Sequence, residues 1–211
     1  TKFYTADGNR DLVGNNFPTF FIRDAIKFPD MVHAFKPDPR TNLDDDSRRF
    51  AFFSHVPEAT RTLTELYYNA GIPASYREMN GNGVHAYKFV NDKDEVHYVK
   101  FHWKSLQGTR NFTPKDVARA QGADYSHMTQ DLVSHISKGD FPKWDLYVQV
   151  LKPQELGNFE FDPLDATKVW PDVALRKVGQ MVLNRNPANV FQETEQGAMA
   201  PSNLIPGIEP S

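Results

Sequence analysis

The alternation of apolar and polar positions predicts an antiparallel sheet in the middle of the chain. Within Gly83–Trp103, aromatic and apolar residues alternate with polar ones on both sides of a turn at Asn91–Asp94, which is the pattern of a hairpin. Trp144–Leu151 and Arg176–Leu183 show the same period of two and predict further strands. Lys2–Thr5 reads as the end of a strand that runs into a turn. The pattern therefore describes strands with two distinguishable faces.

Helical signals lie between these strands. Val56–Ala70 places apolar residues on one face before Gly71, a typical helix stop. Thr113 and the proline after it form a helix start, so Pro114–Gln121 is expected to be helical, and Ser126–Ser137 predicts a second helix nearby. A short helix is also expected to begin within Asp24–Phe28. Helices inserted between antiparallel strands define an α+β fold.

Two other segments are predicted to be irregular. Asp11–Ile22 has a turn-like centre between apolar residues and predicts strand, loop and short strand. Leu204–Ser211 is rich in proline and glycine, and we expect a connector that leads to no further element. Because the chain also starts inside a predicted strand, we expect both ends to be cut from a longer fold.

Composition excludes several classes of function. The chain has 24 Lys and Arg against 27 Asp and Glu, without blocks of like charge, which argues against a nucleic-acid partner. No apolar run approaches the length of a membrane span, and the chain has no Cys. Together with the lack of a signal-peptide pattern, this favours the cytoplasm, with the periplasm as an alternative. The 16 Phe, 8 Tyr and 3 Trp suit a core around a flat ligand, although ordinary packing is the commoner explanation.

The histidines do not predict a metal site. His97 and His102 lie five apart on one predicted strand, and this odd spacing places them on opposite faces. His127 and His135 lie two turns apart on a predicted helix, too far for one ion without another element. The glycine-rich stretch Asn80–Gly83 precedes a strand and reads as a turn, and the usual hydrolase and nucleotide motifs are absent.

One polar group in an apolar stretch is a candidate for chemistry. Asn15 and Asn16 follow Val13-Gly14 and are themselves followed by Phe20, Phe21 and Phe28. A buried amide must find hydrogen-bond partners or be costly, so an asparagine at the edge of a phenylalanine-rich pocket is chemically specific. By pattern alone, however, a turn asparagine bonded to its own backbone is the better interpretation.

A family resemblance reverses that preference. Asp11–Asp30, which reads DLVGNNFPTFFIRDAIKFPD, closely resembles the corresponding segment of the monofunctional heme catalases. The likeness continues through Tyr76–His85, Lys100–Lys104, Asp165–Pro171 and Val182–Pro187. It implies an antiparallel β-barrel of the heme catalase type with inserted helices, incomplete at both ends and assembled as a homotetramer. Residues 1–185 would form most of the barrel core, and 186–211 would start the wrapping segment.

The resemblance also implies roles for individual residues. Asn15 corresponds to the asparagine over the distal face of heme b, where its amide hydrogen-bonds hydrogen peroxide. The remaining heme-contacting positions implied by the likeness are Val13, Phe20, Phe28, Val84, His85 and Met199. For His85 an ordinary strand histidine is the alternative. The implied reaction converts two molecules of hydrogen peroxide into water and oxygen by way of a ferryl heme.

The departures from the family pattern limit what this chain can do by itself. The family's distal histidine and the serine that supports it correspond to positions before Lys2, and the proximal tyrosine to a position after Ser211. We therefore assign no metal ligand here and expect these 211 residues alone to be inactive. Some catalases also bind NADPH near positions matching Tyr68, Ala70, Asn80, Lys104, Trp170 and Asp172. Ala70 and Asp172 replace a helpful arginine and histidine, which makes NADPH doubtful.

Two alternatives stay open at this point. The first is a catalase-related heme peroxidase or hydroperoxide-transforming enzyme, which oxygen evolution from peroxide would distinguish. The second is a heme-free β-barrel binding module, for which the intact protein would show no Soret band.

Overall fold

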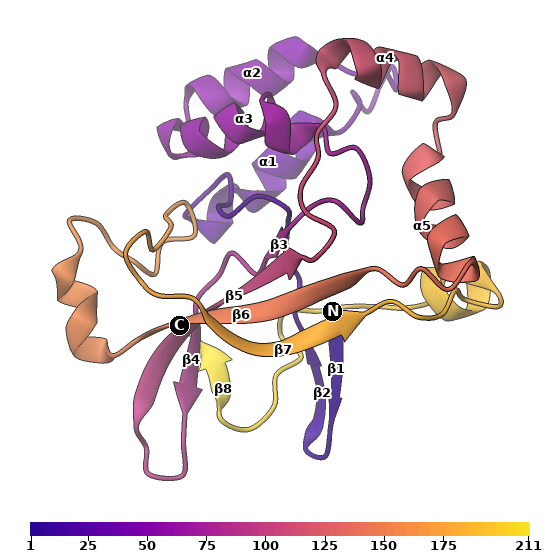
Figure 1. The fold of residues 1–211 in the computed structure, drawn as a ribbon. Coiled ribbons are helices and arrows are strands. Elements are labelled where there is room, and N and C mark those ends of the chain that lie inside the picture. The colour runs from indigo at the N-terminus through magenta and orange to yellow at the C-terminus, as the bar shows by residue number, and fades with distance from the viewer.

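The computed structural model describes all residues, 1–211, and its centre is a six-stranded antiparallel sheet (Figure 1). The longest strand, β5 (Val96–Ser105), pairs with β6 (Lys143–Leu151), whose other edge carries β7 (Arg176–Val182). On the other side of β5 lie β4 (Tyr87–Val90) and, at the far end, the two-residue β3 (Gly81–Asn82). The hairpin expected within 83–103 and the strands expected at 144–151 and 176–183 are confirmed.

Two further strand pairings complete the β-structure. The separate hairpin of β1 (Lys2–Thr5) and β2 (Gly8–Asp11) begins the chain, and β8 (Ile208–Pro210) adds to the edge of β4. The expectation that Leu204–Ser211 leads to no further element is therefore wrong, because its last residues themselves form a strand. The strand pairs run from β7 to β8 as an open path.

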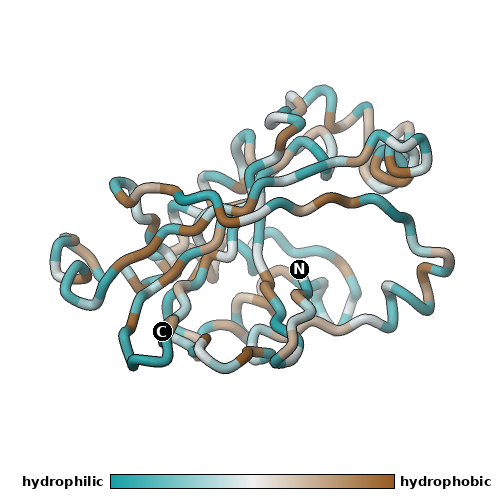
Figure 2. Tube along the Cα trace, turned by 60° about the horizontal axis from the view of Figure 1, so that its bottom comes forward, coloured by the Kyte–Doolittle hydropathy of each residue, from teal (hydrophilic) through white to brown (hydrophobic).

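The two faces of β5 differ in chemistry, as the alternation indicates. Val99 and Phe101 face a core cluster that includes Leu12, Tyr87 and Leu146. The alternate residues Lys100 and His102 point to the opposite face, where Trp170 and Leu151 belong to a second cluster. Figure 2 shows apolar stretches running through the strands while polar residues dominate many connecting loops. The sheet thus separates one apolar cluster from a second face, on which polar side chains such as Lys100 and His102 accompany another apolar cluster.

A group of short helices covers one end of the sheet (Figure 1). It comprises η1 (Ala25–Lys27), α1 (Phe28–Phe35), α2 (Asp46–Ser54), η2 (Pro57–Ala59), α3 (Thr60–Leu66) and η3 (Asn69–Gly71). Apolar side chains from the preceding loop and these helices form a third cluster: Phe21, Ile22, Met31, Phe53, Val56 and Ala59. These helices pack against the loop that follows Asn15, and Thr62 Oγ1 donates to Phe20 O within it.

Two predictions of helices and one of strands need correction. Val56–Ala70 is not one helix but η2, α3 and η3, because Pro57 starts a tight turn and the chain leaves the helix at Tyr67. The helix expected from Asp24 continues to Phe35 as α1. The strands expected within Asp11–Ile22 reduce to the end of β2 and one bridge at Asn15, since this segment packs its phenylalanines against helices.

The later helices are confirmed within a few residues. α4 (Pro114–Ala123) starts at a capping box in which Thr113 accepts from Asp116 N and Asp116 accepts from Thr113 N. α5 (His127–Ser137) follows directly. The remaining helical turns are η4 (Pro153–Asn158) and the π-helix η5 (Phe191–Glu195). No helix has both the length and the apolar character needed to cross a membrane. The helices inserted between antiparallel strands confirm the α+β class.

Candidate functional site

Two loops that are distant in sequence meet at Asn15 and Asn82. Asn15 N donates to Asn82 O at 2.8 Å, and Asn82 N donates to Asn15 O at 2.6 Å. The backbones approach so closely that a β-carbon on Gly14 would lie 2.3 Å from Asn82 O. A glycine at position 14 is therefore a requirement of the contact.

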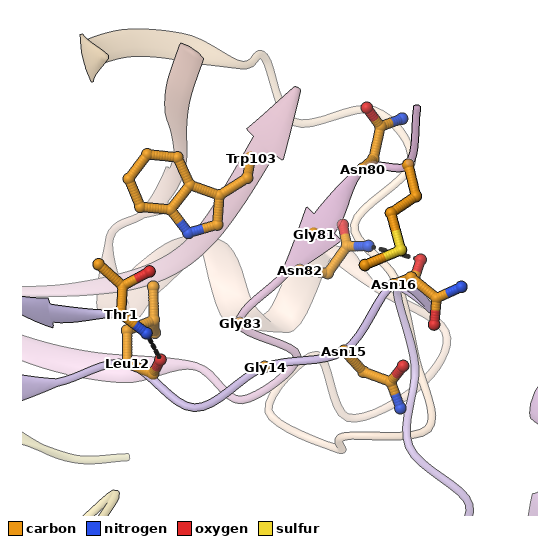
Figure 3. Close-up of a pocket in the computed structure, with 11 residues that line it drawn as sticks. Thr1, Leu12, Gly14, Asn15, Asn16, Asn80, Gly81, Asn82, Gly83 and Trp103 are labelled. Carbon is orange, nitrogen blue, oxygen red and sulfur yellow. Dashed lines mark hydrogen bonds between the residues drawn. The ribbon is translucent and has the colours of Figure 1, made fainter. Parts of the chain in front are cut away.

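The side chain of Asn15 is held at its oxygen and is free at its nitrogen. Its Oδ1 accepts a long hydrogen bond from Phe17 N at 3.4 Å, whereas Nδ2 donates to no protein group. Asn16 differs, because its Nδ2 donates to Ala70 O at 2.7 Å. In Figure 3 the Asn15 side chain points away from the Asn82 side chain. The Asn15 amide thus offers two N–H donors to a ligand.

A cavity of about 350 Å³ lies beside this bridge (Figure 3). Four asparagines contribute to its lining, Asn15, Asn16, Asn80 and Asn82, together with the indole of Trp103. Neutral amides can donate and accept without titrating, so the polarity of this wall is independent of pH.

An aromatic wall begins a few residues after Asn15. The rings of Phe20 and Phe28 stack with centroids 6.4 Å apart and planes 20° apart, and the His85 ring lies 6.1 Å from Phe20. Val84 has a φ of 59°, which is unusual for a β-branched residue and strains the backbone. At this turn the buried Val84 is followed directly by the exposed His85. The strain is consistent with a functional position.

The predicted heme-contacting residues expose apolar surface. Val13 is 40%, Phe28 48% and Met199 57% exposed. A contiguous exposed apolar patch marks a binding site, and these three side chains would contribute apolar surface to one. The structure brings Phe20, Phe28 and His85 together by ring contacts, and the short stretch from Asn82 to His85 links them to Asn15.

Asp11 fixes the segment that follows Met199. Its buried carboxylate accepts from Lys2 Nζ at 2.6 Å, Ala200 N at 3.0 Å and Asn203 Nδ2 at 2.8 Å. The hydrogen bond from Lys2 is the main cause that lowers the pKa of Asp11 to about 2, and Ala200 N adds to it. This anchor was missed in the sequence, since nothing near Asp11 reveals a partner that comes almost 190 residues later.

The pKa values of three basic groups near the site, His85, Lys100 and His102, are lowered. Protein around the ring lowers the pKa of His85 even though the side chain is exposed at one side, and the charge of Lys100 lowers it further. Burial lowers the pKa of Lys100 to about 8, and its Nζ donates to Lys168 O at 2.9 Å. Burial also lowers the pKa of His102 to about 4. The structure contains no group of three or more His, Cys, Asp or Glu arranged to hold a metal ion.

The residues that match a nucleotide-binding surface are only partly assembled. Tyr68, Ala70 and Asn80 line a second cavity of about 290 Å³ together with Asn16. Lys104, Trp170 and Asp172 do not line it, and Trp170 is buried with its Nε1 donating to Pro163 O.

Comparison with known proteins places the whole chain among catalases. A family model described as Catalase matches residues 1–211. The chain is 81% identical over 211 residues to a catalase of Pseudomonas aeruginosa and 63% identical to one of Vibrio cholerae, covering 100% of this chain but 41% and 42% of those proteins. A bacterial catalase structure superposes with a TM-score of 0.96 at 39% identity, and so does catalase A from Saccharomyces cerevisiae at 40%. Both matches cover 100% of this chain and 41% and 44% of the two structures.

Proposed function

Because the chain belongs to the catalase family, we propose that it is part of a heme catalase that converts two molecules of hydrogen peroxide into two of water and one of oxygen. The single observation that carries the proposal is the Asn15 amide, whose Nδ2 has no protein acceptor while its Oδ1 is bonded to Phe17 N. A relationship to catalases favours this reaction over a hydroperoxide-transforming enzyme or a heme-free binding module.

The exposed side chains fit a flat, apolar macrocycle. The stacked rings of Phe20 and Phe28 present an aromatic surface, and Val13 and Met199 add exposed apolar contacts. We assign these residues, with Val84 and His85, to the surroundings of heme b. Bound heme would supply the redox chemistry of its iron. The pKa of His85 is lowered by the surrounding protein, which favours a neutral ring that can accept a hydrogen bond.

Asn15 would bind the peroxide itself. Its two N–H donors can hydrogen-bond a peroxide oxygen and stabilise negative charge as the O–O bond breaks. The amide does not titrate, so this contact would not depend on pH. The apolar wall of Val13, Phe20 and Phe28 would limit water, which strengthens the few polar contacts that remain. The family resemblance assigns the base that moves the peroxide proton, and the tyrosine that ligates iron, to residues other than these 211.

The finer architecture is also part of the proposal. The open sheet would be completed to a closed barrel by further strands at the edges of β7 and β8. Residues 1–185 would form most of the barrel core with inserted helices, residues 186–211 would begin the wrapping segment, and the enzyme would be a homotetramer. We do not extend the proposal to NADPH, because Ala70 gives the cavity near Tyr68 no cation. Asp172, which does not line that cavity, would repel a phosphate group.

Replacing Asn15 tests its proposed role. In the full-length, heme-loaded protein, Asn15→Ala is expected to lower peroxide turnover about 10- to 100-fold, because one preorganised donor to a developing charge is lost. Heme content should stay unchanged, since no structural hydrogen bond uses Nδ2. Oxygen release per heme, with heme counted by its absorption, measures both quantities.

The matched control is Asn9→Ala, which changes an exposed asparagine on β2 whose side chain makes no hydrogen bond. It should leave turnover unchanged. If Asn15→Ala instead loses heme in proportion to its activity, Asn15 is structural and its assignment to peroxide fails.

A further inference from the structure

Behind Asn15, a chain of hydrogen bonds crosses three strands and ends at a loop. His102 on β5 lies between two amides, with Nδ1 2.9 Å from Asn82 Oδ1 and Nε2 2.9 Å from Gln149 Oε1. Gln149 on β6 continues the chain, because its Nε2 donates to Trp170 O at 2.8 Å and to Val173 O at 2.7 Å. Nothing in the proposed reaction uses these side chains directly.

The orientation of Gln149 decides where His102 carries its proton. Both donors of the Gln149 amide are engaged by backbone carbonyls, so the amide cannot turn around without losing two hydrogen bonds. Its Oε1 must therefore face His102 as an acceptor. The hydrogen bond then requires a proton on His102 Nε2.

The other ring nitrogen faces Asn82. Burial lowers the pKa of His102 to about 4, the charges of Lys104 and Lys100 on the same strand act in the same direction, and the Gln149 hydrogen bond opposes them. Tyr147 on β6 is the strand partner of His102 on β5. At neutral pH the ring is neutral, and Nδ1 is an acceptor.

This state of the ring selects one of two orientations for the Asn82 amide. With Oδ1 toward the ring, Asn82 Nδ2 donates to Asn16 O at 3.2 Å, and Nδ1 must be protonated for the His102 contact to be favourable. With the ring neutral, a half-turn of the amide lets Nδ2 donate to Nδ1 and gives up the bond to Asn16. With the neutral ring, the Asn82 side chain is therefore hydrogen-bonded to His102 on β5 and not to Asn16 O.

We infer that His102, as the tautomer protonated at Nε2, is a positioning residue for Asn15 and acts through Asn82. Asn82 is bonded to Asn15 through both backbone groups, and Gly14 packs on Asn82 O without room for a β-carbon. The His102 hydrogen bond restrains the Asn82 side chain, and the Asn82 backbone in turn holds Asn15, so loss of that restraint is expected to loosen the position of Asn15. Misplacing a reacting group by about 1 Å can cost on the order of 100-fold in rate. The inference rests on the proposed function of Asn15.

Two isosteric variants separate the two arms of the ring. In the full-length, heme-loaded protein, the carbonyl of His102→Asn can occupy the place of Nδ1 and keep an acceptor toward Asn82. The longer His102→Gln can reach Gln149 but offers nothing at Nδ1. We expect kcat/KM per heme to fall less than about threefold in His102→Asn and about tenfold in His102→Gln, as for other residues that orient a ligand through hydrogen bonds. A role in holding only the Gln149 and Trp170 loop predicts the reverse order and would overturn the inference.

His97→Asn is the matched control. His97 lies on the same strand but on the opposite face, near Phe89 and Val99, and takes no part in the chain. Its kcat/KM should be unchanged.

A double-variant cycle tests whether His102 acts through Asn15. With Asn15→Ala already present, His102→Gln should cause no further loss beyond about twofold, because the group it positions is gone. The dissociation constant of cyanide, read from the Soret band, provides a second readout that does not depend on turnover, and it should follow the same pattern. If His102→Gln does not load heme, Asn82→Ala takes its place in the cycle and has the same expected result.

The outcomes distinguish the inference from its premise. Losses that multiply in the double variant, while Asn15→Ala alone behaves as expected, overturn the positioning role of His102 and leave the proposed function intact. If Asn15→Ala changes neither turnover nor cyanide affinity, the role of Asn15 fails, and the role of His102 fails with it.

Discussion

At the scale of single residues, Asp11 shows how the chain connects its two ends. Three donors from Lys2, Ala200 and Asn203 converge on this buried carboxylate, directly before the Leu12–Asn15 loop. The charge of Asp11 thereby holds both β1 and the segment after Met199 against β2.

This contact predicts a pH-dependent loss of stability. The folded pKa of Asp11 is about 2, below its value of 3.8 when unperturbed, so its stabilising contribution is fully present above pH 4 and is lost as pH falls toward 2. Asp11→Asn should lower the urea midpoint of unfolding at pH 7, and the difference from the unmodified protein should shrink on acidification.

Asp7→Asn, in the exposed turn between β1 and β2, serves as the control and should not change the midpoint. A difference between Asp11→Asn and the unmodified protein that stays constant down to pH 2 would mean that the carboxylate charge does not carry the effect.

The sequence identified Asn15 but not its supports. The resemblance of the Val13-Gly14-Asn15-Asn16 segment pointed to its amide, and the structure adds that Nδ2 is free. The partners of His102 are Asn82 on β3 and Gln149 on β6, and no local pattern specifies the register of these two strands with β5. Alternation predicts which face His102 points to, but not what it meets there.

At the scale of elements, the close approach of the two loops makes Gly14 a sensitive position. Gly14→Ala would place a β-carbon 2.3 Å from Asn82 O, so the backbone pair between Asn15 and Asn82 must separate. We expect the free energy of unfolding to fall by about 1 to 3 kcal/mol, as at other overpacked sites, which lowers the thermal midpoint. Peroxide turnover should fall as well.

Gly122→Ala is the matched substitution, because a β-carbon there meets nothing within 4 Å and the residue lies in α4. It should raise stability by about 0.5 to 1 kcal/mol, since alanine favours helix over glycine. Calorimetry of both variants checks the pair, and equal effects would contradict the close packing at Gly14.

Elements with a strong local signal could be predicted, and others could not. β5 and β6 alternate clearly, and α4 begins at a capping box, so their bounds were nearly correct. α2 was missed because its first turn is polar and apolar residues begin only at Phe50. β8 has three residues and is defined by pairing with the distant β4, so its strand character arises from tertiary contact alone.

At the scale of the whole molecule, the exposed apolar wall should be stabilised by the group that it binds. A ligand that binds the folded state raises its stability, so heme removal should lower the thermal midpoint of the full-length protein, and adding heme should restore it. Differential scanning calorimetry of the heme-free and reconstituted forms makes the measurement. Equal midpoints would show that the surface of Phe28, Val13 and Met199 is not a heme contact.

The central claim is that this chain supplies the distal amide and aromatic wall of a peroxide-decomposing heme enzyme. The most direct test adds hydrogen peroxide to the full-length, heme-loaded protein and follows peroxide and oxygen together, without any other electron donor. We expect one molecule of oxygen for every two of peroxide consumed, at a rate that falls in Asn15→Ala while the Soret band persists. Peroxide consumption without oxygen release, or release that is indifferent to Asn15→Ala, would contradict it.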